Sequence, residues 1–351
     1  MSGINLRNYR WPAEWEPHAA TWVAWPVNKS TWPGIFERIP PAFAQFVANV
    51  ACFEPVNILL ESDKQPEAHR LMQSACETVG AHFDVRFIDI RVNDSWCRDY
   101  GPMFLNPVST DNGLSPVILD WDYNAWGEKY PPWDADSAVA KRIAESLSLP
   151  SVRPEVVLEG GAVEGNGNGI ILTTESCLLN SNRNTKVDRA KMEHTLRNYL
   201  GASEIVWLPG QGIIGDDTDG HIDQLARFVE ERTTVAAAAY DEDAPEAISL
   251  RENRDALQAG NDGTLTVHEL RMPSPKFQQG HRLPASYCNF YVCNGGVIVP
   301  TFDDSADDVA MQVLQNLFPH HKVIGVPAID LVWGLGALHC LTQQHPKFVT
   351  E

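Results

Sequence analysis

The chain has 351 residues, enough for one large or two ordinary globular domains with ample core. Hydrophobic residues make up 44% and charged residues 21%, a composition that excludes a disordered chain. Asp and Glu number 46 against 27 for Lys and Arg, so the net charge is −19. That charge argues against nucleic acid or an anionic membrane as a partner and favours cationic ligands, although solubility alone would also explain it.

The N-terminal segment lacks the apolar run of a signal peptide, and no stretch of about 18 apolar residues predicts a membrane span. Seven cysteines occur without any Cys-x-x-Cys pattern. This odd number predicts mostly free thiols and neither a disulfide framework nor a thiolate zinc site. We therefore expect a cytoplasmic protein.

In chain order, an irregular Trp-rich start precedes the first periodic segments. Hydrophobic periodicity predicts helices over 38–53 and 65–79, the second ending at Gly80, and strands over 55–61 and 82–90. A polar loop, 94–102, follows directly at the end of a strand, a usual place for catalytic residues. Later elements of this half are strands near 103–106 and 117–122, a helix over 134–147 and a strand over 155–158 that runs into Glu159.

The second half of the chain continues the alternation of helices and strands. Asn-Gly repeats at 166–169 predict a hairpin turn before a strand over 170–174, because these residues accept positive φ readily. A phosphate-binding loop is disfavoured, since no Gly-Lys-Ser/Thr follows. The remaining expected elements are helices over 186–200, 245–257 and 305–317, strands over 204–208, 265–270 and 321–326, and hairpins over 226–239 and 287–302.

A repeat is visible in the spacing of the polar loops. Their key acids and bases, Asp99, Glu159, His221 and Cys340, are separated by 60, 62 and 119 residues, the last gap close to twice the others. Such a period suggests repeated units around an axis, each delivering one loop to a shared centre. About five units of helix, strand, polar loop and hairpin fit the length, and no linker divides them. We expect a single domain over 1–351.

Two carboxylates, an imidazole and a thiol at one centre suit a guanidinium substrate. Asp99 and Asp223 can bind this planar cation with paired hydrogen bonds, and Cys340, next to two glycines, can attack its carbon as the thiolate. His221 would donate a proton to the departing amine and then activate water. Glu159 would hold His221 and favour its protonated form. No metal is required by this chemistry.

Several alternatives compete with this interpretation. His221 with Asp223 could be a metal pair, but no second histidine lies at ligand spacing. Asp217 and Asp219 suggest a calcium loop, yet the glycine comes too early for one. A papain-like order is contradicted because the histidine precedes the cysteine. His339 is expected to point away from the site and to serve packing. A propeller-like binding module without catalysis remains the alternative from another class.

The residues resemble the agmatine deiminase family, also called the bacterial peptidylarginine deiminase type, within the guanidine-modifying (pentein) superfamily. The similarity runs along nearly the whole chain. It is carried by Trp96-x-Arg98-Asp99-x-Gly101-Pro102, Glu159-Gly160-Gly161, Asp219-Gly220-His221-Ile222-Asp223 and His339-Cys340-Leu341-Thr342-Gln343-Gln344. The resemblance implies an α/β fold, a five-bladed pseudo-fivefold propeller of αββαβ repeats.

The resemblance also implies an activity. Asp99 and Asp223 would bind the guanidinium, Glu159 and His221 would be the acid/base pair, and Cys340 the nucleophile, converting agmatine and water to N-carbamoylputrescine and ammonia. Asp217 and Trp96 are further substrate-binding candidates. The small cationic guanidine is the expected partner, no cofactor or metal is implied, and a homodimer is the assembly considered.

One departure bears on the substrate. Where family members that act on agmatine usually carry Gly-Gly-Gly-Asn-Ile, this chain has Gly-Leu-Gly-Ala-Leu at 334–338. Arginine, free or within a peptide, therefore stays open as an alternative substrate.

Overall fold

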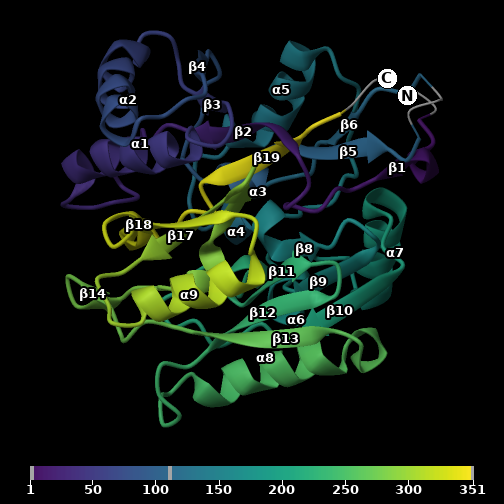
Figure 1. Cartoon of the computed structure of the whole chain (residues 1–351). Helices are drawn as coiled ribbons and strands as arrows, with labels where there is room; N and C mark the ends of the chain where they lie inside the picture. The colour runs from purple at the N-terminus through teal and green to yellow at the C-terminus, as the bar shows by residue number, and fades with distance from the viewer. Residues whose placement is uncertain (1–3, 110–112, 349–351) are drawn as a thin grey trace.

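The computed structural model describes residues 4–109 and 113–348, so the extreme ends of the expected domain lie outside it. The fold is mixed α/β (Figure 1), with five sheets of three or four strands and one small hairpin in the described part. Three sheets share one arrangement, an antiparallel pair followed by a parallel strand. They are β8 (Val163–Gly165), β9 (Ile170–Thr174) and β10 (Glu204–Leu208); β11 (Ala226–Glu230), β12 (Thr233–Ala238) and β13 (Thr266–Arg271); β16 (Tyr291–Cys293), β17 (Gly296–Thr301) and β18 (Lys322–Pro327).

The other two sheets extend this arrangement by one strand each. Their strands are β1 (Tyr9–Arg10), β5 (Met103–Pro107), β6 (Val117–Leu119) and β7 (Ser151–Val152); β19 (Thr342–Pro346), β2 (His18–Ala24), β3 (Val56–Leu59) and β4 (Val85–Ile88). The small hairpin joins β14 (Phe277–Gln278) to β15 (His281–Arg282).

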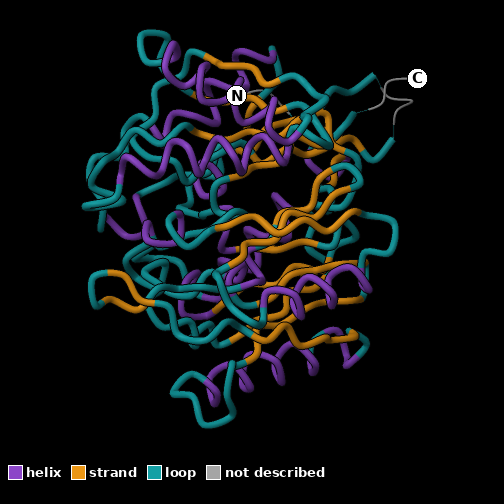
Figure 2. The backbone as a smooth tube through the Cα atoms, turned by 60° about the vertical axis from the view of Figure 1, so that its left-hand side comes forward, coloured by secondary structure: helices purple, strands orange, loops and turns teal. Residues whose placement is uncertain are grey.

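Long helices connect each strand to the parallel strand that follows it, and α8 lies along the outside of its sheet (Figure 2). These helices confirm those expected from periodicity, with ends shifted by a few residues. They are α1 (Ile39–Val50), α2 (Gln65–Val79), α5 (Val139–Leu147), α7 (Arg189–Leu200), α8 (Ala247–Ala259) and α9 (Asp307–Leu317). Gly80 ends α2 at φ +69°, the left-handed conformation that favours glycine.

Two expectations about strands are wrong. The Trp-rich start is irregular only in part, since it contains β2, which pairs with β19 beyond the Cys340 loop, Val23 opposite Thr342. The expected strand over 155–158 is reduced to a single bridge at Val157. The bridge to Asp122 uses the backbone of Val156 and Leu158, and on the other side the Asn184 side chain takes both backbone groups of Val157, where a second strand would otherwise pair.

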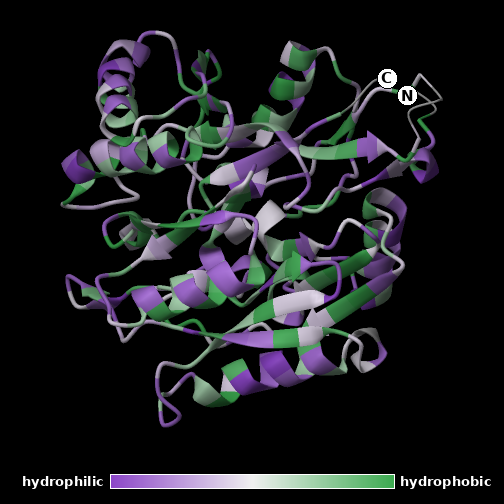
Figure 3. Cartoon of the chain, viewed as in Figure 1, coloured by the Kyte–Doolittle hydropathy of each residue, from purple (hydrophilic) through white to green (hydrophobic). Residues whose placement is uncertain are grey.

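Apolar residues of helices and sheets pack together in the core. The outer helices alternate between hydrophilic and hydrophobic residues along their length (Figure 3). The central strands of the three-stranded sheets, β9, β12 and β17, are buried on both faces over most of their length, as is usual where helices cover parallel strands. All seven cysteines are free thiols, which confirms the expectation from the sequence. Among the described residues, no helix is both long and apolar enough to cross a membrane.

Candidate active site

The candidate residues of the polar loops lie in or next to short helical turns. The one-turn helix α3 (Cys97–Tyr100) contains Asp99, and 3₁₀ turns begin directly after Glu159 and after His221, the second of which contains Asp223. Cys340 lies two residues before β19. All five side chains are buried, at 5% exposure or less. The turns thus place residues from distant parts of the chain in the interior.

Gly161 is the point where three of these side chains converge. A Cβ atom on Gly161 would lie 2.6 Å from His221 Nδ1, 2.7 Å from Asp99 Oδ1 and 3.1 Å from Asp223 Oδ2. Any larger residue would therefore fill the space between the imidazole and the two carboxylates. The backbone N–H of Gly161 also donates to Asp99 Oδ1 at 3.0 Å. Glycine at this position keeps the centre open.

Asp99 is held from two sides. Besides Gly161, Trp126 Nε1 donates to Asp99 Oδ2 at 2.9 Å, and His221 Nδ1 lies 3.6 Å from Oδ1. Burial, together with the nearby charges of Asp223 and Glu159, raises the pKa of Asp99 to about 6 even though His221 opposes the shift. At neutral pH the carboxylate is therefore ionised.

Cys340 faces the second carboxylate. Its Sγ lies 3.5 Å from Asp223 Oδ2 and accepts a hydrogen bond from Asn289 Nδ2 at 3.1 Å. Burial and then the charges of Asp223 and Asp99 raise the pKa of the thiol well above its ordinary value. In the free protein the sulfur is therefore protonated at neutral pH.

His221 is a buried cation. Burial alone would lower the pKa of His221, but the charge of Asp99 and contacts with Cys177 and Glu159 raise it to about 10. Neither ring nitrogen has a hydrogen-bond partner among the described residues, and the same holds for Glu159 Oε2. Glu159 Oε1 instead accepts from Arg183 Nε at 2.7 Å. Glu159 thus acts on His221 through its charge, and the structure has no hydrogen bond from it to His221.

Glu159 and His221 also belong, with Cys177, to a group of side chains that could hold a metal ion. Glu159, Cys177 and His221 each place a ligand atom within 4.8 Å of the other two. Zinc binds such side chains only when thiol and imidazole have lost their protons. Here the pKa of His221 is about 10, burial raises the pKa of Cys177, and Arg183 already binds Glu159. A divalent cation would have to displace two protons beside a guanidinium, so this set suits proton transfer better than metal binding.

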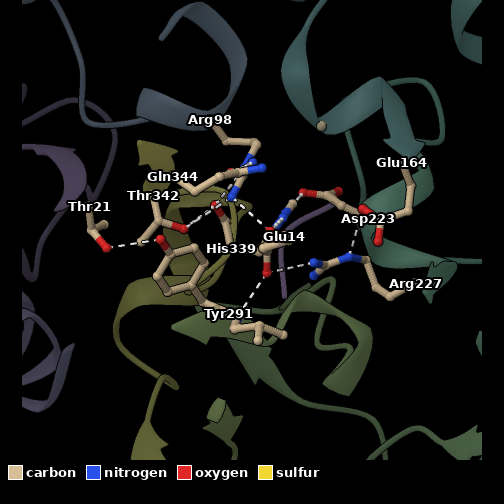
Figure 4. Close-up of polar contacts among 12 residues, drawn as sticks. Glu14, Thr21, Arg98, Glu164, Asp223, Arg227, Tyr291, His339, Thr342 and Gln344 are labelled. Atoms are coloured by element: carbon tan, nitrogen blue, oxygen red, sulfur yellow. Dashed lines mark hydrogen bonds and ion pairs between the residues drawn. The ribbon is translucent and has the colours of Figure 1, made fainter. Parts of the chain in front are cut away.

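A network of buried charges lies beneath Asp223 (Figure 4). Glu14 binds Arg98 at 3.2 Å, Arg227 at 2.8 Å and His339 Nε2 at 2.8 Å. His339 Nδ1 donates to Asp223 Oδ2, also at 2.8 Å. The expectation that His339 serves packing is therefore wrong, because both its ring nitrogens bind carboxylates.

This network occupies only one of the two carboxylate oxygens of Asp223. Burial would raise the pKa of Asp223, but the hydrogen bond from His339 and nearby positive charges lower it. Asp223 Oδ2 is taken by His339, whereas Oδ1 is buried without a partner among the described residues. An ionised, unpaired oxygen in the interior is an acceptor that a bound cation can satisfy.

Asp99 and Cys340 open onto one cavity of about 1030 Å³. Its lining includes the aromatic residues Trp96, Tyr123, Trp126, Tyr130 and Trp333. Leu335 also lines the cavity and has φ +74°, a conformation rarely adopted by leucine. Asp217 lies on the wall as expected from the sequence, but its carboxylate already binds Lys129 and the Tyr130 hydroxyl.

A family model described as Porphyromonas-type peptidyl-arginine deiminase matches residues 10–346. The chain belongs to this family. Agmatine deiminase of Pseudomonas aeruginosa strain LESB58 is 35% identical over 364 residues, covering 96% of this chain and 95% of the relative.

Solved structures of this family agree with the sequence match. Agmatine deiminase of Enterococcus faecalis superposes with a TM-score of 0.88 at 31% identity, covering 99% of both chains. A C. jejuni agmatine deiminase variant with substrate bound gives a TM-score of 0.86 at 30% identity, covering 97% of this chain and 96% of that one. The α/β fold is therefore that of the family.

Sequence reasoning missed several residues of this site. Trp126, Glu14 and Asn289 were not assigned to the site from the sequence, and Glu14 has Glu16 and His18 close by, so its charge alone does not single it out. Glu14 contacts Arg98 and His339, which lie 84 and 325 residues away in sequence. Asn289 contacts Cys340, 51 residues away. Spacing along the chain carried no signal for such contacts.

Proposed function

We propose that this protein hydrolyses the guanidinium group of agmatine, giving N-carbamoylputrescine and ammonia through a covalent intermediate on Cys340. The observation that carries the proposal is the convergence of His221, Asp99 and Asp223 at Gly161, with the Cys340 sulfur 3.5 Å from Asp223. Relatives and structures named agmatine deiminase, similar over nearly the whole chain, support the choice of substrate.

The two carboxylates bind the cation. A guanidinium presents N–H donors along each edge of a plane, which suits carboxylates on two sides. Asp223 Oδ1 is free to accept from it, and Asp99 is fixed by Trp126 and Gly161. The aromatic wall, including Trp96, packs on the flat faces and the aliphatic chain of the substrate. Asp217, on the cavity wall, would have to leave Lys129 and Tyr130 to bind the substrate directly.

Substrate binding activates the thiol. The bound cation offsets the charges of Asp99 and Asp223 that raise the pKa of Cys340, so the sulfur releases its proton to water when the substrate is present. The thiolate attacks the guanidinium carbon, and His221 donates a proton to the departing amine, which leaves as ammonia. Glu159 keeps His221 protonated beforehand.

Hydrolysis of the intermediate completes the cycle. The sulfur is then bonded to the carbon of a thiouronium, and neutral His221 takes a proton from water as the oxygen attacks. Collapse breaks the carbon–sulfur bond and releases the thiolate. Loss of the hydroxyl proton leaves the ureido product, and the sulfur is protonated again. None of these steps requires a metal or cofactor.

The remaining proposals concern the whole protein. The five sheets with a shared pairing order support a five-bladed, pseudo-fivefold α/β propeller formed by one domain over 1–351. A small guanidine substrate fits a cytoplasmic enzyme without nucleic-acid or membrane partners, and a homodimer is the assembly we would test first.

Product identification tests the function. Purified protein is incubated with agmatine, arginine and an arginyl peptide, and each product is identified by mass spectrometry alongside ammonia release. We expect N-carbamoylputrescine to form far faster than citrulline or peptidyl-citrulline. Faster conversion of the arginyl peptide would favour the peptidyl-arginine alternative, and no ammonia from any guanidine would contradict the enzymatic proposal.

Leu335 provides a test of substrate selection. Leu335→Gly removes a side chain from the cavity wall and relieves a positive φ, so it should raise the free energy of unfolding by about 1 kcal/mol. The wider cavity should reduce the preference for agmatine over an arginyl peptide, in kcat/KM, by about tenfold. The matched control is Ser148→Gly, which relieves a positive φ at the end of α5. It should stabilise without changing the preference, and an unchanged preference in Leu335→Gly would exclude Leu335 as a selector.

The pH dependence follows from Asp99 and His221. The Cys340 thiol must lose its proton, so kcat/KM for agmatine should rise with pH until about 10, where loss of the His221 proton removes the general acid and ends the rise. Protonated Asp99 cannot bind a cation, so below about pH 6 kcat/KM should fall by about a further tenfold per unit. Steady-state kinetics across this range measures both limbs. An acidic limb near pH 4, the ordinary aspartate range, would show that burial leaves Asp99 unperturbed.

A further inference from the structure

Arg183 joins two of the polar loops from inside the protein. It lies in the turn that precedes α7, and its side chain is fully buried. Its Nε donates to Glu159 Oε1 at 2.7 Å, and its Nη2 donates to the carbonyl oxygen of Thr218 at 2.9 Å. Its Nη1 donates to Asp219 Oδ2 and, at 2.9 Å, to Asn182 Oδ1. All three nitrogens of the guanidinium are therefore engaged.

The contact with Thr218 also fixes the position of His221. Thr218 Oγ1 accepts from the backbone N–H of His221 at 3.0 Å, while the Thr218 carbonyl oxygen accepts from Arg183. Between them, Asp219 has φ +65°, which is uncommon outside glycine, and forms an ion pair with Arg183. The guanidinium thus connects the carboxylate of Glu159 to the loop that carries the imidazole.

This connection keeps the two members of the acid/base pair apart. A carboxylate oxygen of Glu159 lies within 4.8 Å of a ring nitrogen of His221, yet no hydrogen bond joins them. Both ring nitrogens and Glu159 Oε2 are buried without partners in the part of the chain that the structure describes. A buried carboxylate and a buried imidazolium so close together would form a charge-assisted hydrogen bond if they were free to move. Arg183 prevents this by holding Oε1 and the loop of His221.

The separation suits a group that both gives and takes a proton. In the proposed cycle, His221 donates a proton to the departing amine and then removes one from water. A direct ion pair with Glu159 would strongly favour the charged imidazole, and the neutral form that the second step needs would become rarer. Held apart, the carboxylate acts through its charge alone, and the bound guanidinium of Arg183 offsets part of that charge.

We propose that Arg183 is a positioning residue, which holds Glu159 and the loop of His221 at a fixed separation, so that the carboxylate favours the imidazolium without binding its proton. The inference rests on the proposed function through the two proton transfers assigned to His221. It deepens that function by naming the group that keeps the proton of His221 transferable.

Three substitutions of Arg183 test the separation. Arg183→Met removes every donor, so the freed carboxylate of Glu159 can turn to His221. Arg183→Lys keeps a cation that can bind Glu159 and should therefore preserve the separation. Arg183→Gln retains a donor for the Thr218 carbonyl oxygen but carries no charge to hold a carboxylate. The matched control is Arg189→Met, which also removes an arginine bound to a glutamate, Glu175, but at an exposed position.

The first measurement is proton NMR of protein containing isotope-labelled histidine, without substrate. An imidazolium N–H that donates to a buried carboxylate gives a strongly downfield signal, because the hydrogen bond is charge-assisted. Arg183→Met should show such a signal that the wild type lacks, and adding Glu159→Gln should abolish it. Arg183→Lys and Arg189→Met should show no new signal. If Arg183→Met does not fold, Arg183→Gln should show the signal instead, and its absence from the folded variant would overturn the proposal.

Turnover provides the second readout. In Arg183→Met, removal of a proton from water should slow more than donation to the amine, so the thiouronium on Cys340 should accumulate. Acid quenching during turnover, followed by mass spectrometry of the intact protein, detects it. Both kcat and KM for agmatine should fall about ten- to hundredfold, with kcat/KM near the wild-type value. Arg189→Met should match the wild type in all three.

A purely structural role would give a different result. A general disturbance of the site would lower kcat/KM without accumulation of the thiouronium, and that outcome would overturn the proposal. The NMR signal requires no substrate. Its appearance in Arg183→Met of a protein that hydrolyses no guanidine would uphold the role of Arg183 and contradict the proposed function instead.

Discussion

Cys340→Ser is expected to lower kcat for agmatine by on the order of a millionfold, as in enzymes that lose their nucleophile. The hydroxyl replaces the thiol with almost no change in shape. However, it ionises far less readily than a sulfur that already lies against Asp223. The variant should still bind agmatine, because Asp99 and Asp223 are unchanged. Single-turnover assays for ammonia, with agmatine binding measured by calorimetry, test both parts.

Cys52→Ser is the matched control, since Cys52 is a free thiol outside the cavity lining. Its kcat should stay within a factor of about two of the wild type, as is usual for a substitution away from the site. Residual turnover of more than about one part in a hundred in Cys340→Ser would remove Cys340 from the reaction and with it the covalent mechanism.

Asp99→Asn is expected to reduce kcat/KM by more than about a hundredfold, on the order of 3 kcal/mol, the effect of removing one partner of a buried charge pair. The amide cannot neutralise the guanidinium. Its NH₂ group must also face either the Gly161 N–H or the Trp126 indole N–H, both of which are donors. Steady-state kinetics with agmatine measures the loss.

Asp99→Asn should also change the pH dependence of the activity. Asp99 is the leading charge that raises the pKa of His221, so the alkaline limb of the pH profile should move below about 10. Asp188→Asn provides the control, because Asp188 caps α7 at an exposed position and asparagine caps as well as aspartate. Normal turnover in Asp99→Asn, or an unmoved alkaline limb, would show that Asp99 does not carry the charge of the site.

The polar chemistry of the site could be predicted because it is local in sequence. Asp99, His221 and Asp223 lie in short turns with glycine and acidic neighbours, a pattern that differs from the apolar strands beside them. The spacing of Asp99, Glu159, His221 and Cys340 also predicted a common centre, and the structure places Asp99, His221 and Asp223 around Gly161. The helices could be predicted equally well, because hydrophobic periodicity is a property of a single segment.

Long-range pairing could not be predicted in this way. The strand β2 has no clear alternation, and it is stabilised by β19, which lies more than 300 residues later in the chain. His339 was assigned to packing because nothing near it in sequence shows its contact with Glu14. The expected strand over 155–158 shrinks to one bridge, and a side chain distant in sequence, Asn184, takes the backbone groups of Val157 on the side away from that bridge.

The position of β19 has a consequence for how the protein loses function. This strand is at the edge of its sheet, β2 is its one strand partner among the described residues, and Cys340 lies two residues before it. Edge strands can detach in partial opening events that cost less free energy than complete unfolding. Such an event would carry the sulfur out of reach while most helices and sheets stay intact. On warming, inactivation should therefore precede the loss of circular dichroism, and amide hydrogens of β19 should exchange ahead of those in β9 or β12.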